Sequence, residues 1–194
     1  MRVAIVKYNA GNTASVANAL TRLGVEPLVT DNADELRAAD KVIFPGVGEA
    51  STAMKYLRER HLDAVVRSLT RPVLGICLGM QLMCESSEEN NIDCLGILPY
   101  RARQFVSDTL KIPHTGWNRI TNLKSPLFAG VAEGEHVYFV HGYYVETGDS
   151  TTATCEYGQR FSAAISRNNF HAVQFHPEKS GAVGERILEN FLNI

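Results

Sequence analysis

The segment Val73–Gln81, with the sequence Val-Leu-Gly-Ile-Cys-Leu-Gly-Met-Gln, decides the fold more than any other stretch of the chain. Its apolar start predicts a buried β-strand, and its end predicts the beginning of a helix. Between them, Gly75 and Gly79 flank Cys77 at the Gly-x-Nuc-x-Gly spacing of a nucleophile elbow, with cysteine in place of serine. A sharp strand-to-helix turn crowds the backbone, and glycines relieve that crowding. The pattern predicts an α/β fold with Cys77 exposed above the sheet.

Alternating strand and helix patterns surround this turn in the first half of the chain. Strands are expected at Val3–Val6, Pro27–Val29, Lys41–Phe44 and Pro72–Ile76, and helices at Asn12–Leu23, Asp31–Arg37, Glu49–Arg60, Leu62–Leu69 and Leu78–Cys84. Such alternation favours a parallel sheet with helices on both faces. The strand at Lys41–Phe44 is expected to stop at Pro45.

The second half is richer in strand patterns and poorer in helices. Strands are expected at Arg103–Val106, Trp117–Ile120, Val137–Val140, Thr151–Tyr157, Phe161–Arg167 and His171–Phe175. Gly158-Gln159 predicts a hairpin, and Ala182–Leu192 a final helix. We therefore expect one α/β domain, residues 1–194, with a mixed, mostly parallel sheet flanked by helices.

Composition and charge exclude several classes of function. The 194 residues carry a net charge of −2 and 45% hydrophobic residues, and no basic patch indicates a nucleic-acid partner. The apolar runs are too short to span a membrane, and Met1–Lys7 is typical of a first strand rather than a signal peptide. We expect a cytoplasmic enzyme.

Four cysteines are present, and one has a setting typical of a nucleophile. Cys77 would sit at a helix N-terminus, which favours a thiolate, and the backbone N–H of Leu78 would point to a developing oxyanion. The alternative is a buried structural cysteine; Cys84, Cys94 and Cys155 have no such setting, and we expect each to be a small core or surface residue. None of the four has zinc-ligand spacing, so neither a metal nor a cofactor is expected.

A cysteine nucleophile needs a base, and His176 has the best setting among six histidines. It follows an apolar run at the end of an expected strand and precedes Pro177-Glu178. Pro177 can turn the chain so that Glu178 meets the imidazole and orients it. His61 lies in a charged helical stretch and is expected at the surface, and His171 is expected to be structural.

A glycine-rich turn follows the expected strand at Lys41–Phe44. It has neither the Gly-Lys-Ser/Thr of a P-loop nor a full dinucleotide fingerprint. Backbone N–H groups of Gly46, Val47 and Gly48 can form a nest for an oxyanion. An ordinary glycine turn is the alternative.

Three motifs together resemble the class I, triad-type, glutamine amidotransferase family: Pro45–Gly48, Gly75–Gln81 and Phe175–Ser180. They occur in the family's order and span most of the chain. The resemblance implies a flavodoxin-like fold, a Cys77–His176–Glu178 triad and L-glutamine as nitrogen donor. It also implies that Gln81 and Glu89 hold the amino-acid end of glutamine.

Other segments resemble one subfamily, the glutaminase subunits of imidazole glycerol phosphate synthase. They are Tyr8-x-x-Gly11-Asn12, Ile112–Asn118, Tyr138–Tyr144 and Pro177–Ser180, with departures from the usual pattern at Asn9, Thr115 and Gly142. This resemblance implies histidine biosynthesis and a (β/α)8-barrel cyclase subunit as partner in a heterodimer. The candidate interface residues are Asn12, Trp117, Tyr138, His141 and Lys179.

Three alternatives remain open at this point. One is a glutaminase subunit of another pathway, such as anthranilate, aminodeoxychorismate or pyridoxal phosphate synthesis. Another is a cysteine peptidase or deglycase-like enzyme on the same elbow. The third is a non-catalytic binding module, which fits poorly with Cys77, His176 and Glu178 all present.

Overall fold

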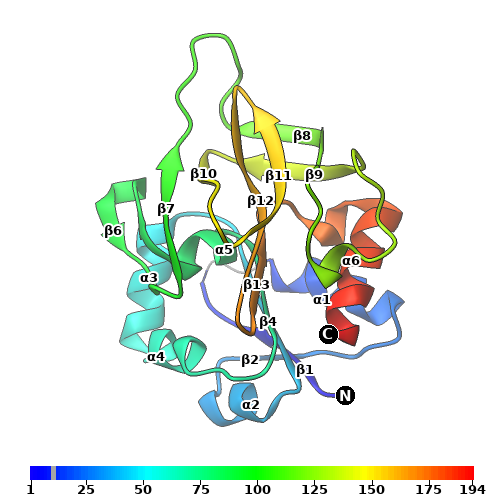
Figure 1. Cartoon of the computed structure of the whole chain (residues 1–194). Coiled ribbons are helices and arrows are strands. Elements are labelled where there is room, and N and C mark those ends of the chain that lie inside the picture. The colour runs from blue at the N-terminus through cyan, green and yellow to red at the C-terminus, as the bar shows by residue number, and fades with distance from the viewer. Residues whose placement is uncertain (10–11) are drawn as a thin grey trace.

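The computed structural model describes residues 1–9 and 12–194 (Figure 1), so Gly11 of the N-terminal motif lies outside the described residues. Within them, the main sheet has seven strands in the order β11-β12-β13-β4-β3-β1-β2. Their bounds are β1 (Val3–Val6), β2 (Leu28–Thr30), β3 (Lys41–Gly46), β4 (Val73–Cys77), β11 (Thr151–Tyr157), β12 (Gln159–Arg167) and β13 (Phe170–Val173). The strands from β2 to β13 pair in parallel, and β12 and β11 continue the sheet antiparallel. The predicted mixed, mostly parallel sheet is confirmed.

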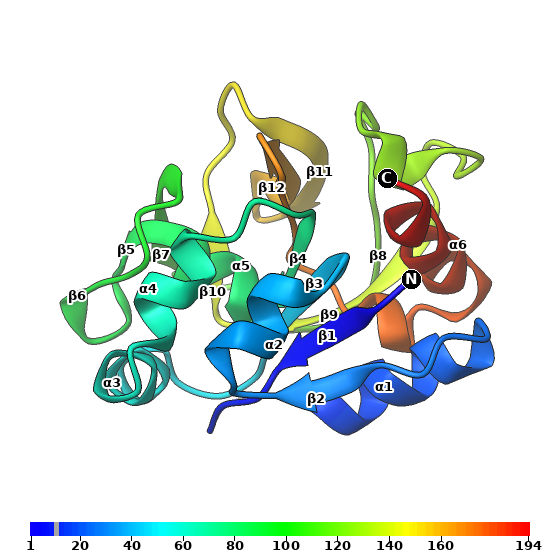
Figure 2. The ribbon, with the colours of Figure 1, turned by 90° about the horizontal axis from the view of Figure 1, so that it is seen from below.

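Helices cover both faces of this sheet, because successive strand residues point to opposite sides and both sides are apolar. In β1, Ala4 and Val6 pack in one core cluster, and Val3 and Ile5 in the other. Figure 2 shows α1 and α6 on the opposite side of the sheet from α3 and α4. The helices are α1 (Thr13–Arg22), α2 (Ala33–Ala38), α3 (Ala50–Glu59), α4 (Leu62–Arg67), α5 (Leu78–Met83) and α6 (Gly181–Asn193).

Smaller elements flank the main sheet and frame one end of it. A second sheet, in the order β10-β7-β5-β6, contains β5 (Cys84–Ser87), β6 (Ile92–Asp93), β7 (Leu98–Gln104) and β10 (Tyr143–Val145). A separate antiparallel ribbon pairs β8 (His114–Arg119) with β9 (His136–His141). The 3-10 turns are η1 (Glu89–Asn91), η2 (Pro126–Phe128) and η3 (Pro177–Lys179).

Hydrogen bonds fasten the β8–β9 ribbon to the segment that follows β13. The backbone N–H of His176 donates to the Tyr138 carbonyl at 2.9 Å. The Tyr138 N–H in turn donates to the Ser180 hydroxyl oxygen at 3.0 Å. The ribbon therefore lies beside the carboxyl ends of the parallel strands, where open α/β sheets bind their ligands.

Most expected elements are present, with shifted ends, but one prediction about β3 was wrong. The strand continues through Pro45 to Gly46 instead of stopping at Phe44. Proline is accepted because pairing with β1 ends at Ile43, so Pro45 faces a paired strand only on the β4 side. Strand β7 begins earlier than predicted, and β5, β6 and β10 had not been expected. No helix within residues 1–9 and 12–194 has the length and apolarity needed to cross a membrane.

Candidate active site

The turn between β4 and α5 has the backbone expected of a nucleophile elbow. Cys77 has φ 54° and ψ −109°, a backbone conformation that residues other than glycine rarely adopt. A Cβ at Gly79 would collide with the Phe44 carbonyl oxygen, and one at Gly75 would lie 2.9 Å from the sulfur of Met83. The backbone contact requires glycine at position 79, whereas at Gly75 the nearest atom belongs to a flexible side chain and the Met80 nitrogen lies at 3.1 Å. One prediction needs correction: Cys77 is only 6% exposed.

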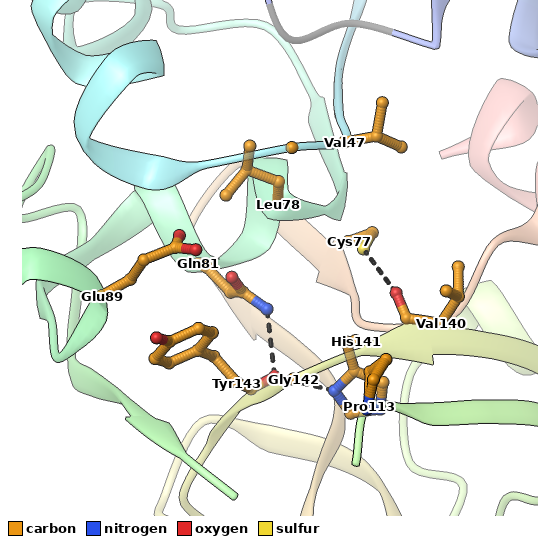
Figure 3. A pocket seen from close by; sticks show the side chains of 11 residues that line it. Val47, Cys77, Leu78, Gln81, Glu89, Pro113, Val140, His141, Gly142 and Tyr143 are labelled. Atoms are coloured by element: carbon orange, nitrogen blue, oxygen red, sulfur yellow. Dashed lines mark hydrogen bonds between the residues drawn. The ribbon is translucent and has the colours of Figure 1, made fainter.

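The sulfur of Cys77 is covered by the strand β9. Its Sγ lies 3.8 Å from the Val140 carbonyl oxygen, to which a thiol can donate (Figure 3). On another side, Nε2 of Gln174 lies 3.7 Å from the sulfur and donates to it. Because the ribbon covers the elbow, Cys77 lines a cavity and is not exposed on the surface.

His176 and Glu178 make the contact that the sequence predicts. Pro177 begins the 3-10 turn η3, which brings Glu178 back so that His176 Nδ1 donates to its Oε1 at 2.8 Å. Both side chains are buried, with exposures of 1% and 0%. The amide of Asn12 donates to the same carboxylate oxygen at 3.3 Å.

The electrostatics around His176 favour its charged form. Burial, the largest effect, lowers the pKa of His176, but Cys77 and Glu178 together more than offset it and raise the pKa to about 10. Because Nδ1 donates to a carboxylate, Nε2 is the nitrogen left to exchange a proton. Nε2 is buried and has no hydrogen-bond partner among the described residues. The imidazole is thus placed for proton transfer to and from a group beside Cys77.

A cavity of about 270 Å³ opens beside Cys77. Its lining residues come from the elbow, the turn after β3, η1 and the ribbon: Val47, Gly48, Cys77, Leu78, Gln81, Glu89, Pro113, Val140, His141, Gly142 and Tyr143. Figure 3 shows Gln81 and Glu89 on one side of this cavity and Cys77 on the other.

The residues predicted to bind glutamine have different settings. Gln81 Nε2 donates to the Tyr143 carbonyl and to Gln174 Oε1, each at 3.1 Å. Glu89 Oε2 accepts from the Ala50 N–H at 2.6 Å, and burial raises the pKa of Glu89. The neighbouring Glu88 accepts from the Gln104 N–H and lies outside the cavity lining.

The glycine-rich turn after β3 is held tightly at its start. The Tyr8 hydroxyl donates to the Pro45 carbonyl at 2.7 Å, and a Cβ at Gly46 would come within 2.8 Å of the Leu78 Cβ. Further along, Gly48 has φ +100°, and a Cβ there would meet no described atom within 4 Å. Val47 and Gly48 line the cavity, so their backbone lies on the same side as the sulfur.

The three other cysteines lack a reactive setting. Cys84, Cys94 and Cys155 are buried, and burial raises the pKa of each thiol, to about 12 for Cys94 and Cys155. All three are therefore core residues and not surface residues. Among the described parts of the chain, no group of three His, Cys, Asp or Glu residues is arranged to hold a metal ion.

Comparison with known proteins identifies the family. A family model described as "Glutamine amidotransferase class-I" matches residues 4–194. This chain belongs to the class-I glutamine amidotransferases. Solved structures similar to this amidotransferase include a "Crystal structure of glutamine amidotransferase", with TM-score 0.77 and 19% identity over 100% of this chain and 98% of that one. The "Structure of PurLQS from Thermotoga maritima" has TM-score 0.73 and 20% identity over 99% and 97%. These two show the shared fold.

Closer relatives of this amidotransferase carry the name "Imidazole glycerol phosphate synthase subunit HisH". The protein of Bacteroides fragilis is 56% identical over 196 residues, covering 100% of both chains. That of Bacteroides thetaiotaomicron is 54% identical over the same span. That of Shewanella loihica is 46% identical, covering 98% of this chain and 89% of the other.

The candidate interface residues fall into two groups in this amidotransferase. Trp117 is 57% exposed and packs edge-to-face on the half-buried Tyr138, and Lys179, the last residue of η3, is exposed. Asn12 and His141 instead bond inward. His141 is buried, its Nδ1 donates to the Tyr143 carbonyl at 2.7 Å, and its Nε2 lies 3.0 Å from His114 Nδ1.

Several residues of the site were not found from the sequence. Gln174 interrupts the apolar run that leads to His176. A polar residue inside an otherwise apolar strand was the one sign in the sequence that it belongs to the site. Nothing in the sequence indicated the bond between Tyr8 and Pro45, because it depends on the tertiary fold. At the departure Gly142, a Cβ would meet only Pro113 at 4.0 Å among described atoms, so a serine there has room.

Proposed function

We propose that this amidotransferase is the glutaminase subunit of an imidazole glycerol phosphate synthase, acting in cytoplasmic histidine biosynthesis. The observation that carries the proposal is 56% identity over the full length of both chains to a protein with that subunit's name. The cavity with Cys77 in its wall, and the buried contact between His176 and Glu178, support the glutaminase chemistry.

In the proposed reaction, Cys77 is the nucleophile and His176 the base. The thiolate attacks the side-chain carboxamide carbon of L-glutamine, and the carbonyl π electrons move to oxygen. Backbone N–H groups near Val47, Gly48 and Leu78 stabilise that oxyanion. When the C–N bond breaks, Nε2 of His176 gives its proton to the leaving nitrogen and ammonia forms. Water then hydrolyses the γ-glutamyl thioester, releases glutamate and restores the thiol.

The far end of the cavity suits the amino-acid end of glutamine. The Glu89 carboxylate and the carbonyl oxygen of Gln81 are acceptors on the cavity wall, and the α-ammonium group supplies three donors. Both hydrogens on Gln81 Nε2 are already used, so Gln81 meets the substrate as an acceptor. Cys77 at the opposite end would then face the side-chain amide.

A (β/α)8-barrel cyclase is the proposed partner, docked in a heterodimer over the mouth of the cavity. Ammonia in bulk water at neutral pH would be protonated and lost as a nucleophile. The exposed Trp117 and the half-buried Tyr138 supply the aromatic surface typical of interface centres, and the exposed Lys179 adds a charge. Here the ammonia would be used to form imidazole glycerol phosphate and an aminoimidazole carboxamide ribotide.

The test measures glutamate release by the chain alone, and then with the cyclase subunit of the same organism and its ribonucleotide ligand. Low activity alone and a large increase in the complex support the proposal. Fast turnover that ignores the cyclase would place the glutaminase in another pathway. The Cys77→Ala variant should lose about 10⁶-fold in kcat, while Cys155→Ala, which alters another buried cysteine, should retain activity. Native turnover by Cys77→Ala would rule out the mechanism.

A further inference from the structure

One fully buried side chain joins the nucleophile to the substrate-binding glutamine. Gln174 follows β13 directly and is 0% exposed. Its Nε2 lies 3.7 Å from the Cys77 sulfur, and its Oε1 accepts from Gln81 Nε2 at 3.1 Å. The backbone N–H of Gln174 is fixed to the Ala163 carbonyl at 2.8 Å, so the side chain extends from a rigid strand end. A single carboxamide therefore contacts both ends of the reaction site.

The orientation of this carboxamide is fixed by a backbone carbonyl. The Tyr143 oxygen can only accept, so the Gln81 atom that lies 3.1 Å from it must be the nitrogen. The second hydrogen of that nitrogen needs an acceptor, which must be Gln174 Oε1. The other end of Gln174 is then an N–H donor, and it faces the sulfur. Reversing Gln174 would place two N–H donors opposite each other.

We propose that Gln174 is a positioning residue that presents an N–H donor to the Cys77 sulfur and holds the carbonyl oxygen of Gln81 toward the substrate. The inference rests on the proposed role of Cys77 as nucleophile. A hydrogen bond to sulfur favours the thiolate over the thiol, because the charged form is the stronger acceptor.

Gln174 also determines how Gln81 meets glutamine. With both hydrogens of Gln81 Nε2 engaged by Tyr143 and Gln174, Gln81 can offer only an acceptor to the α-ammonium group. Figure 3 shows the Gln81 oxygen on the side away from Tyr143. Loss of Gln174 would leave the Gln81 nitrogen held by the Tyr143 carbonyl alone, so the Gln81 oxygen would be directed less firmly at that cation. Substrate binding and nucleophile activation should therefore weaken together.

The test is Gln174→Met, which keeps the side-chain length and removes both polar contacts. Iodoacetamide alkylation of Cys77, followed by mass spectrometry against pH, should show its pH midpoint rise by about one unit. In the cyclase complex, KM for glutamine should rise about tenfold and kcat should fall. A purely structural defect would lower the active fraction and kcat but leave KM and the alkylation midpoint unchanged. Gln159→Met, on an exposed glutamine, is the matched control.

A second variant keeps the inference testable if Gln174→Met does not fold. Gln81→Met leaves Gln174 in place but removes the N–H group that orients it, so the Cys77 alkylation midpoint should again rise, although Gln81 makes no hydrogen bond to the sulfur. An unchanged midpoint in either folded variant overturns the role of Gln174. If iodoacetamide in the native protein modifies other cysteines and spares Cys77, the proposed nucleophile fails instead.

Discussion

Two buried histidines on neighbouring segments have pKa values that are shifted in opposite directions from that of an ordinary histidine. His176, after β13, is 1% exposed, and His141, at the end of β9, is 5% exposed. Burial lowers the pKa of both. At His176 the neighbouring Cys77 and Glu178 more than offset burial and raise the pKa to about 10. At His141 burial is opposed mainly by the Tyr143 carbonyl, and the pKa falls to about 3.

The difference shows that burial keeps an imidazole neutral at His141, and that the neighbouring Cys77 and Glu178 outweigh burial at His176. The neighbours of His141 are a carbonyl and His114, whose own pKa burial lowers to about 4. Neutral His141 therefore stabilises the fold above pH 6.5, and that stability is lost as pH falls toward 3. Charged His176 stabilises the fold below pH 6.5, and that stability is lost as pH rises through 10.

The largest effect is expected from removing the carboxylate of Glu178, which keeps His176 charged and so makes it differ from His141. Glu178→Gln keeps the shape of the side chain but removes the charge that opposes burial of the imidazolium. We expect kcat in the cyclase complex to fall on the order of 10³-fold or more, as for other triad orienters. Glu189→Gln, on the exposed face of α6, is the control. A loss of less than tenfold would mean that Glu178 does not orient the base.

The second prediction concerns the titration of His176 without its sulfur neighbour. In Cys77→Ala, burial and Glu178 remain while the contribution of Cys77 is gone. We expect the pKa of His176 to fall by about two units or more. An NMR titration of the imidazole in native and variant protein measures it, and the pKa of His141 should stay low in both. An unchanged pKa of His176 would show that Glu178 alone holds the charge.

The two regions also differ in how far the sequence could predict them. Around Cys77, each requirement is local: Gly75 and Gly79 clear space for the turn, and Pro177 brings Glu178 to His176 within three residues. Short-range rules therefore suffice to place the elbow and the carboxylate–imidazole contact.

The ribbon depends on contacts between distant segments, which residue patterns do not report. His114 and His141 meet because Cα register across β8 and β9 places them opposite each other. Without that register, the sequence predicted His141 as a residue of the partner interface and Gln174 only as part of a strand. The same limit applies to Cys77, whose burial comes from Val140 on β9.

The third prediction tests the neutral histidine through acid stability. At pH 5 the unfolded state binds a proton at position 141 that the folded state does not, which costs about 2 kcal/mol of unfolding free energy. His141→Gln can donate to the Tyr143 carbonyl and accept from His114, so it should match the native protein at pH 8 and exceed it at pH 5. Urea unfolding at both pH values measures the difference, with the exposed His136→Gln as control. Equal pH dependence in native and His141→Gln protein would contradict a neutral His141.

The smallest effect should come from the far end of the same hydrogen-bond chain. Because His141 Nδ1 donates to a carbonyl, its Nε2 must accept from His114 Nδ1, which leaves His114 Nε2 to accept from Asn118 Nδ2 at 3.3 Å. Asn118→Ala should therefore cost about 1 kcal/mol of unfolding free energy at pH 8. The exposed Thr115→Ala on the same strand is the control.

At lower pH, Asn118→Ala should then reduce the free energy of unfolding by less than it does at pH 8. The Asn118 donor favours neutral His114, because a protonated Nε2 would place two N–H groups opposite each other. Without that donor the pKa of His114 should rise from about 4, although burial still holds it below its ordinary value, and the folded variant takes up a proton more easily as pH falls. The difference from the native protein should be smaller at pH 5 than at pH 8. If it grew instead, Asn118 would be stabilising the charged form, which would mean that its amide oxygen, and not its nitrogen, faces His114 Nε2.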